Sequence, residues 1–274
     1  MQSIFAFTFI RKIMWRLGRK IYTYSRGDIQ NNPSINGEYW LLKKVVNGIS
    51  NQSIFFDIGA NKGNWTAKAL SFSKDFKNIY IYAFEPSKVT RAILEDRFRG
   101  NTSISVQSYA LSSSNGKAFF YSQKGSGGTN SLSPISGTKS EVVRLYTIDC
   151  FISDLGIKSI SMIKIDTEGF DFLVLKGAER SLSEGVIEVI QFEYNWRWLI
   201  NHVCLKDVFD LIANKPYLFG KLVGNTIEFY DKWHFELDRF FENNFVLIKE
   251  NSVYSKLGLK MYFDNSNVAN KSNY

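Results

Sequence analysis

The sequence predicts one α/β domain in which a mostly parallel sheet carries helices on both faces. Its 274 residues suit a single well-buried domain better than two small ones. The hydrophobic fraction of 45% and the aromatic fraction of 16% are typical of a packed globular protein. From Gly37 onward, helical and strand-like segments alternate, as they do in a parallel sheet whose strands are connected by helices.

The first part of this domain is predicted to contain three strands separated by helices. Helices are expected at residues 37–49, 64–74 and 88–100, and strands at residues 53–59, 78–87 and 103–111. The strand segments are short and rich in Ile, Phe, Tyr and Val, which favour β structure. Gly48 closes the first helix and Pro86 ends the second strand, because each disfavours continuation of its element.

The second part departs from simple alternation and then resumes it. Strands at 116–122 and 141–147 flank a Gly/Ser-rich loop at 123–137. A buried strand at 160–166, a helix at 169–182 and a strand at 186–195 follow, and then a hairpin at 217–231 and a last strand at 243–250. Gly224 and Asn225 supply the hairpin turn. The polar tail at 264–274 is expected to be loose.

The chain begins with an apolar run that leads into a basic, aromatic stretch. We expect an extension at 1–36, a main domain at 37–250 and a polar tail at 251–274. The charges follow the apolar run, which is atypical of a signal peptide, and the run ends at Arg11, too early to span a bilayer. A helix here would carry Arg11, Lys12, Arg16, Arg19 and Lys20 and could lie on an anionic membrane surface. The alternative is a helix packed on the domain or in a dimer.

Acidic residues close several of the predicted strands. Asp57 lies near the end of the first strand, Glu85 near the end of the second, and Asp166 ends the strand at 160–166. Ligands of an open α/β sheet bind outside the carboxyl ends of its strands, so these residues and the 109–111 turn are expected to face one crevice. A buried carboxylate costs free energy unless a partner compensates it, which indicates a cationic ligand.

Two nucleotide-like ligands compete for this crevice, and their charge decides between them. A dinucleotide brings an anionic pyrophosphate and prefers the spacing Gly-x-Gly-x-x-Gly. This chain instead has Gly59-x-x-x-Gly63 after Asp57. S-adenosylmethionine carries an ammonium and a sulfonium, which carboxylates stabilise, and Glu85 is placed to accept two hydrogen bonds from a ribose diol. We therefore expect S-adenosylmethionine as the cofactor.

An ordered series of motifs carries a family resemblance over roughly residues 52–195. The motifs are FFDIGANKGNW, YAFEPS, ALSSSNG, LYTIDCF and MIKIDTEGFDFLVLKGAERSL, followed by IQFEYN. The series resembles the FkbM-type S-adenosylmethionine-dependent methyltransferases. The resemblance implies a Rossmann-like class I methyltransferase fold, with a mostly parallel seven-stranded sheet flanked by helices and an inserted β-hairpin. It also implies O-methylation of a sugar, glycan or natural product.

The same resemblance implies roles for individual residues. The methionine moiety would be surrounded by Asp57, Gly59, Asn61 and Gly63, the ribose bound by Glu85, and the adenine flanked by Ala110 and Leu111. Asp166 and Glu168 would lie near the transferring methyl and are the candidate catalytic pair. A sugar hydroxyl is a very weak acid, so such a carboxylate would accept its proton late, as bond formation acidifies the oxygen.

The catalytic candidates have structural alternatives. Asp166 could cap the helix that starts near Gly169 or bind the cofactor's amino group, and Glu168 could serve the helix dipole. A divalent metal held by Asp166, Glu168 and Asp149 is conceivable, but no metal is expected.

Residues beyond the fifth strand could contribute to an acceptor site. His202 could act as a base or be structural, and Glu193 and Asn195 could touch an acceptor hydroxyl. Trp196 and Trp198 could stack on a sugar ring or fill the core. The loop at 123–137 is expected to be a lid or acceptor-binding loop, with a surface insertion as the alternative.

Composition bears on compartment and partners. The formal charge of +8 and the pI near 9.3 favour acidic partners in general, although a merely Lys-rich surface is the better explanation. Cys150 and Cys204 are too few for a disulfide framework, which favours a cytoplasmic setting. The N-terminal segment could add peripheral contact with the inner face of the membrane. We expect a small-molecule or glycan acceptor and no nucleic acid, because no aromatic-basic interleaving is visible. A nucleic-acid methyltransferase and a non-catalytic cofactor-binding protein are the alternatives.

Overall fold

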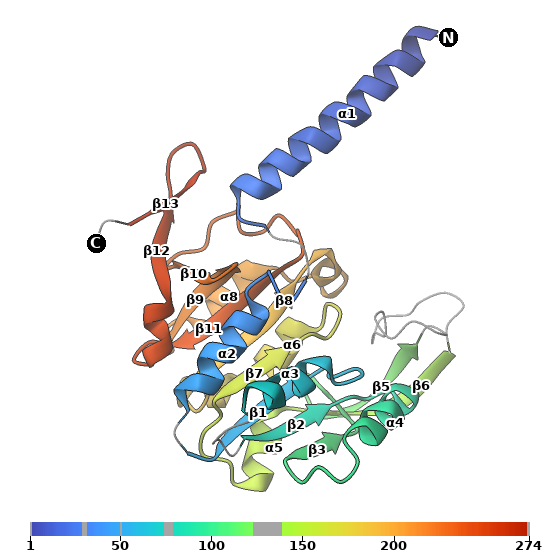
Figure 1. Cartoon of the computed structure of the whole chain (residues 1–274), viewed down its shortest axis with the longest axis vertical. Coiled ribbons are helices and arrows are strands. Elements are labelled where there is room, and N and C mark those ends of the chain that lie inside the picture. Colours follow the sequence, from blue (N-terminus) through green and yellow to red (C-terminus); the bar gives the residue numbers. More distant parts are fainter. Residues whose placement is uncertain (1, 29–31, 50, 74–78, 123–138, 273–274) are drawn as a thin grey trace.

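A ten-stranded mixed sheet forms the centre of the molecule, in the order β13-β12-β10-β9-β11-β8-β7-β1-β2-β3 (Figure 1). A smaller sheet has the order β4-β6-β5. The computed structural model describes residues 2–28, 32–49, 51–73, 79–122 and 139–272, with side chains in the first helix described from Thr8. The loop at 123–137, predicted to be a lid, lies outside the described residues.

The strands of the large sheet are β1 (Ser53–Ile58), β2 (Ile79–Phe84), β3 (Ile104–Gln107), β7 (Met162–Ile165), β8 (Val189–Tyr194), β9 (Tyr217–Val223), β10 (Thr226–Tyr230), β11 (Asn243–Lys249), β12 (Gly258–Phe263) and β13 (Ala269–Lys271). The small sheet contains β4 (Tyr109–Leu111), β5 (Gly116–Ser122) and β6 (Lys139–Tyr146). The α-helices are α1 (Gln2–Ser25), α2 (Glu38–Gly48), α3 (Asn64–Phe72), α4 (Lys88–Arg97), α5 (Ile148–Leu155), α6 (Asp171–Lys176), α7 (Glu179–Ser183) and α8 (Leu205–Ile212). Short 3₁₀ helices are η1 (Trp196–Asn201) and η2 (Val253–Leu257).

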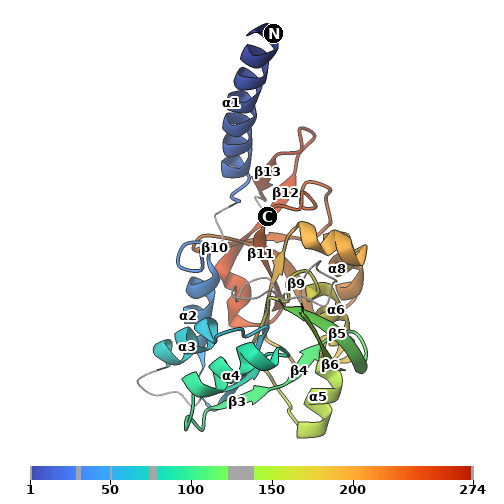
Figure 2. The same ribbon diagram turned by 90° about the vertical axis from the view of Figure 1, so that its right-hand side faces the viewer.

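Helices cover both faces of the large sheet. Figure 2 shows α2, α3 and α4 on one side and α5, α6 and α8 on the other. Successive side chains of β1 point to opposite faces of the sheet. Phe55 packs in one hydrophobic cluster with Leu41 of α2, and Phe56 packs in another against Phe151 of α5. Both clusters are buried, which explains why the central strands are almost continuously apolar in sequence.

The prediction of a mostly parallel α/β sheet is confirmed, although the large sheet is mixed and also contains antiparallel pairs. Strands β8, β7, β1, β2 and β3 pair in parallel, whereas β11 pairs antiparallel with β8 and with β9, and β9 pairs antiparallel with β10. The expected count of seven strands is too low, in part because the chain from Gly258 onward adds β12 and β13. There β12 pairs with β10 and β13 with β12, so the tail expected to be loose contains a strand. The hairpin turn at Gly224 and Asn225 is confirmed.

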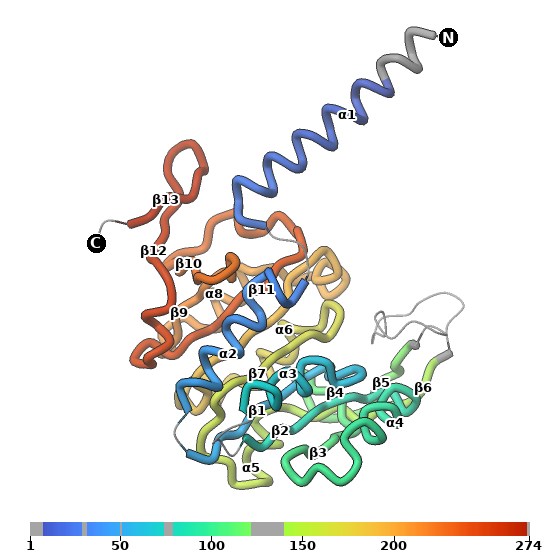
Figure 3. Tube along the Cα trace, viewed as in Figure 1, coloured from blue at the N-terminus to red at the C-terminus, as the bar shows by residue number. Residues whose placement is uncertain are grey.

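The inserted hairpin is also confirmed, but it belongs to a separate sheet. Strands β5 and β6 pair antiparallel, and β4 pairs in parallel with β6. The single strand predicted at 103–111 is therefore wrong: it divides at Ser108 into β3 and β4, because the chain leaves the large sheet to pair with the hairpin. Figure 3 shows β5 and β6 at the opposite side of the molecule from β12 and β13.

Two helical predictions need correction. The helix expected at 169–182 is divided into α6 and α7 around Gly177, where a Cβ would lie 2.1 Å from the backbone oxygen of Ser112. Helix α5 was not predicted, although Thr147 caps it by accepting a hydrogen bond from the Cys150 N–H and Gly156 ends it in the left-handed region.

Helix α1 extends away from the body of the molecule (Figures 1 and 2). Its C-terminal end is held by Tyr22, whose hydroxyl donates to Glu236 at 2.6 Å, and by Arg26, which pairs with the same carboxylate at 2.6 Å. The pKa of Glu236 is lowered to about 2, chiefly by a hydrogen bond from Arg239, with smaller contributions from Tyr22 and Arg26. Among the described residues, no helix combines the length and apolarity needed to cross a bilayer.

Candidate functional site

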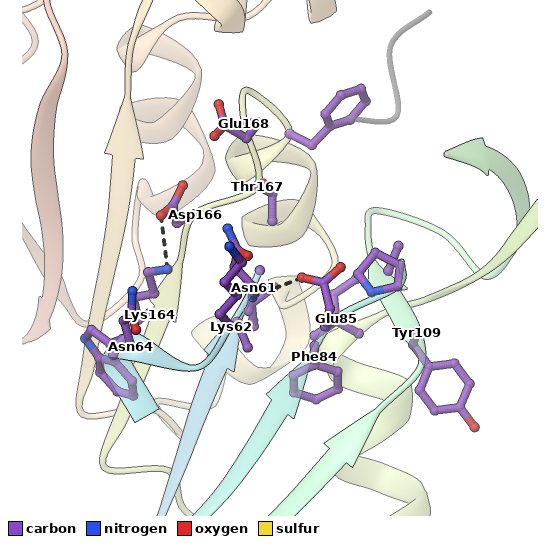
Figure 4. Close-up of a pocket in the computed structure, with 18 of the residues that line it drawn as sticks. Asn61, Lys62, Asn64, Phe84, Glu85, Tyr109, Lys164, Asp166, Thr167 and Glu168 are labelled. Carbon is purple, nitrogen blue, oxygen red and sulfur yellow. Dashed lines mark hydrogen bonds and ion pairs between the residues drawn. The ribbon is translucent and has the colours of Figure 1, made fainter. Parts of the chain in front are cut away.

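A cavity of about 520 Å³ opens at the carboxyl ends of the parallel strands (Figure 4). Its walls come from the loops after β1, β2 and β7, from β4, and from the start of α2. The lining residues are Pro33, Glu38, Tyr39, Ile58, Gly59, Ala60, Asn61, Lys62, Asn64, Trp65, Phe84, Glu85, Pro86, Tyr109, Ala110, Leu111, Phe120, Lys164, Asp166, Thr167, Glu168 and Phe170. This is the crevice that the strand-end carboxylates predicted, since parallel strands present their carboxyl ends at one edge.

A polar row crosses the sheet beneath this cavity. Asp57 of β1 lies opposite Lys164 of β7, and Lys164 lies opposite Gln191 of β8. Each of these residues interrupts an apolar strand, and all three are buried. Gln191 donates to Glu38 of α2 at 2.8 Å, so the row is tied to the helix that covers it. Cross-strand register, and not sequence proximity, brings these side chains together.

Asp57 is paired within the protein. It is completely buried and is not one of the residues that line the cavity. Its Oδ2 accepts a hydrogen bond from Thr66 at 2.7 Å, and its Oδ1 lies 3.7 Å from the Lys164 ammonium. Burial raises the pKa of Asp57, while Lys164 and Thr66 act in the opposite direction. The sequence predicted that a cationic ligand would compensate this buried carboxylate. Part of that positive charge is instead supplied by Lys164.

Lys164 is the residue that sequence reasoning missed. Its Nζ bonds Asp166 at 3.1 Å and faces Asp57 and Glu38 as well. Burial by itself would lower the pKa of Lys164, but the three carboxylates raise it above the usual value for a lysine. The ammonium therefore stays charged at neutral pH. A lysine in the middle of the apolar segment MIKI was the available signal.

The two glycines of the first loop have different structural roles. Gly59 has φ +77°, and a Cβ there would lie 1.9 Å from the backbone oxygen of Asp166, so the loops after β1 and β7 touch at this point. Gly63 has φ +75° and directly precedes α3, and a Cβ there would meet Phe98 and Leu94 within 2.6 Å. Gly63 therefore serves the packing of α3 on α4 and does not line the cavity.

Glu85 forms one wall of the cavity directly after β2. Its two oxygens accept backbone N–H groups, Oε2 from Asn61 and Oε1 from Ser87, each at 2.9 Å. In Figure 4 the Asn61 bond links the loops after β1 and β2. Burial raises the pKa of Glu85 to about 7 despite these donors. Each carboxylate oxygen can accept a second hydrogen bond, which a diol could supply.

An apolar wall lies beside Glu85. Tyr109, Ala110 and Leu111 of β4 line it together with Phe84 and Phe120. The predicted positions Ala110 and Leu111 are therefore at the cavity, but they belong to a strand of the small sheet and not to a turn after the third strand. A flat aromatic base would bury its faces here, because the surface offers few polar groups.

The loop after β7 holds the two catalytic candidates at the opposite wall. Asp166 pairs with Lys164, and Glu168 pairs with Arg197 of η1 at 3.0 Å. Glu168 has φ +56°, an uncommon conformation for a residue with a side chain. Burial and the neighbouring Asp166 raise the pKa of Glu168 to about 7, which Arg197 partly offsets.

The helix-cap alternatives for Asp166 and Glu168 are not supported by their contacts. Asp171, the first residue of α6, accepts the N–H groups of Thr167 and Gly169 at 3.4 and 3.3 Å. Because Asp171 satisfies this turn, Asp166 and Glu168 are left to face the cavity. Burial raises the pKa of Asp171 to about 7.

The remaining acceptor-site candidates lie outside the lining set. Asn195 donates to Glu193 at 2.8 Å, and both are buried behind the cavity wall. His202 is exposed at the end of η1. Trp198 is fully buried against Phe192, which bears out the core alternative, and Trp196 is 57% exposed.

Asp149 also lies elsewhere. Its carboxylate accepts the N–H groups of Arg180 and Ser181 at 2.8 and 2.9 Å, at the start of α7. It is therefore committed to a helix start and does not line the cavity with Asp166 and Glu168. Within the described ranges, no group of three or more His, Cys, Asp or Glu side chains has an arrangement that could hold a metal ion.

Several solved structures are similar to this chain. Methyltransferase FkbM from Methylobacillus flagellatus KT is 17% identical over 77% of this chain and 47% of that chain, with a TM-score of 0.46. A putative rRNA-methylase from Clostridium thermocellum is 6% identical over 78% of this chain and 96% of that chain, also with a TM-score of 0.46. Precorrin-6y C5,15-methyltransferase from Geobacter metallireducens GS-15 is 10% identical over 78% of this chain and 88% of that chain, with a TM-score of 0.42. This chain spans less than half the length of the Methylobacillus protein.

The family assignment comes from a sequence model of the methyltransferase FkbM domain. No curated protein matches the chain. The FkbM domain model matches residues 57–219, more than half of the 274 residues. The matched range begins at Asp57 and contains the loops after β1, β2 and β7 that wall the cavity. The chain therefore belongs to the FkbM methyltransferase family.

Proposed function

We propose that this protein uses S-adenosylmethionine to methylate a hydroxyl oxygen of a sugar, glycan or related small molecule. The observation that carries the cofactor half of this proposal is the composition of the cavity. Four carboxylates line it (Glu38, Glu85, Asp166 and Glu168) against two lysines (Lys62 and Lys164), a formal difference of two negative charges. Such a lining favours a ligand with an ammonium and a sulfonium over one with a pyrophosphate.

The polar atoms at the cavity also fit a nucleoside ligand. Three lining residues carry a buried side-chain atom without a hydrogen-bond partner among the described residues: Asn61 Oδ1, Trp65 Nε1 and Thr167 Oγ1. An unpaired buried polar atom costs about 1–3 kcal/mol, so a polar ligand that pairs with it is stabilised. Glu85 would hold the ribose, Ala110 and Leu111 the adenine, and Gly59 to Asn61 the methionine moiety.

The bound cofactor would supply an electrophilic methyl group, and the chain would supply position and a proton acceptor. Glu168 is the stronger candidate base, because its raised pKa of about 7 makes its carboxylate a better acceptor at neutral pH than an ordinary glutamate. It would take the hydroxyl proton as the acceptor oxygen becomes an ether. Arg197, 3.0 Å away, holds the carboxylate in place. Asp166 is the weaker candidate because Lys164 neutralises it.

Cofactor binding is tested first, by titration calorimetry with S-adenosylhomocysteine. Thr167→Val removes a hydroxyl with no partner in the described part of the chain, so we expect unchanged or higher folding stability with about three- to tenfold weaker binding. Thr66→Val is the matched control, because it removes a hydroxyl that is hydrogen-bonded to Asp57. In this variant the folding stability should fall. Absence of saturable binding at about 1 mM ligand, where free energies near −4 kcal/mol are detectable, would reject the cofactor.

The acceptor is tested separately, by transfer of a tritiated methyl group to a panel of sugars, nucleotide sugars, lipid-linked glycans and RNA. We expect incorporation into a hydroxyl-bearing carbohydrate or related small molecule. Incorporation into RNA alone, lost at raised salt, would assign the alternative of a nucleic-acid methyltransferase. Cofactor binding without transfer to any member would favour the non-catalytic alternative.

A further inference from the structure

Helix α1 exposes a continuous apolar stripe. With about 3.6 residues per turn, residues spaced three and four apart share one face of a helix. The stripe is formed by Ile10 (55% exposed), Ile13 (48%), Met14 (67%), Leu17 (57%), Ile21 (60%) and Tyr24 (87%). Large apolar side chains at this exposure cost free energy in water, and their contiguity along one face distinguishes them from scattered surface hydrophobics.

The opposite side of the same helix is attached to the body of the protein. The guanidinium of Arg19 lies 5.3 Å from the ring of Phe241, and the ring of Tyr22 lies 6.0 Å from that of Phe241. The Tyr22 hydroxyl also bonds Glu236. On the helical wheel, Arg19 and Tyr22 fall opposite or nearly opposite the stripe. The body therefore holds α1 by its polar side and leaves the apolar stripe turned outward.

The charge of α1 has one sign only. Residues 8–25 contain Arg11, Lys12, Arg16, Arg19 and Lys20 and no acidic residue. Arg11 and Lys20 border the stripe on its two sides, and Lys12 and Arg16 lie on the far side. Apolar residues flanked by basic ones match a surface that offers acyl chains below a layer of negative headgroups.

We propose that α1 lies in the surface of a bilayer containing anionic lipids, with the stripe from Ile10 to Tyr24 inserted among the acyl chains and the flanking basic residues at the headgroups. A second copy of this chain is a poorer occupant. Two stripes packed together would bring the Arg11 and Lys20 borders of both helices close to each other, and α1 has no carboxylate to pair with them. In the sequence, α1 is followed closely by Pro33, Glu38 and Tyr39, which line the cavity, so docking of α1 would keep the cavity near the membrane.

The test is co-sedimentation of the full chain with vesicles of phosphatidylcholine alone or with about 30 mol% phosphatidylglycerol. We expect binding to the anionic vesicles to be about tenfold tighter, or more, than binding to phosphatidylcholine alone. Leu17→Glu with Ile21→Glu should reduce that binding about tenfold or more, because each buries a charge among acyl chains. Val89→Glu with Val253→Glu is the matched control, since both valines are exposed (74% and 68%) on other elements and the charge change is equal.

A second pair of variants distinguishes the effect of the basic residues on α1 from the effect of the net charge of the protein. Arg11→Gln with Lys20→Gln should weaken binding to anionic vesicles, while Lys117→Gln with Lys158→Gln, both exposed outside α1, should not. Three results would overturn the proposal: equal binding to neutral and anionic vesicles, equal binding by the stripe variant and its control, or a wild-type dimer in light scattering that the stripe variant abolishes. The last result would assign the stripe to a second copy. Circular dichroism of each variant establishes that the fold is retained, and no cofactor is required in any arm.

Discussion

Replacement of Gly59 by alanine is expected to separate two loops that form the cavity. A Cβ at Gly59 would lie 1.9 Å from the backbone oxygen of Asp166, whereas real Cβ atoms essentially never approach closer than 3.0 Å, so the loops must move apart by at least 1.1 Å. The positive φ of +77° adds backbone strain. The displaced loop carries Asn61, whose N–H bonds Glu85 at 2.9 Å.

Gly100 provides a matched control for this change. It has φ +79°, almost the same as Gly59, but nothing lies within 4 Å of the position of its Cβ. Gly100→Ala therefore measures the backbone strain alone, about 1 kcal/mol of lost stability. Forced repacking of a close contact typically costs a further 1–3 kcal/mol, so Gly59→Ala should lose about 2–4 kcal/mol in all.

Two measurements check this prediction: urea denaturation gives the free energy of unfolding, and calorimetry gives the affinity for S-adenosylhomocysteine. We expect Gly59→Ala to bind about tenfold or more weakly, because a shift of this size misaligns hydrogen-bonding groups. Gly100→Ala should bind as wild type. Equal losses of stability in the two variants, or an unchanged affinity of Gly59→Ala, would refute the close contact between the loops.

Three further predictions concern the charged groups at the site. Lys164→Met should lower the free energy of unfolding by about 3–5 kcal/mol in urea denaturation, because Asp57 and Asp166 lose their buried cation; a loss below about 1 kcal/mol would contradict this role. The free energy of unfolding should fall as pH rises from about 4.5 to about 7, because the raised pKa values of Glu38 and Glu85 let the folded state keep protons that the unfolded chain has released. Urea denaturation at pH 5 and at pH 8 compares the two free energies, and a higher value at pH 8 would contradict the prediction. Glu168→Gln should slow methyl transfer about 10²- to 10⁴-fold while cofactor affinity stays within about twofold, and an unchanged turnover rate would exclude Glu168 as the base.

The local elements could be predicted because their causes are local. Apolar runs such as the one ending at Asp57 identify buried strands, Gly224 and Asn225 fit the turn of a hairpin, and Pro86 disfavours continuation of β2. These signals need no partner segment. They also placed Glu85 and Asp166 at strand ends, which is why both were expected at one cavity, and both line it.

The errors arose where a distant segment decides the outcome. The chain from Ile104 to Leu111 has continuous strand character, but its second part pairs with β6, more than thirty residues further along the chain. Gly177 divides α6 from α7 because Ser112 lies against it. The polar tail becomes β13 because β12 offers it an edge. Neither composition nor periodicity records such contacts.

The sequence by itself determined that a parallel α/β core would gather acidic residues at one sheet edge, and it supplied the motifs of the family. Only the tertiary structure decided how those acids are compensated. The alternation of side chains along a strand specifies which face Asp57 and Lys164 occupy, but strand order and register specify that they face each other. Those two properties depend on the packing of the whole chain, so the partners of Lys164, which lies between Asp57 and Asp166, could be identified only in the folded protein.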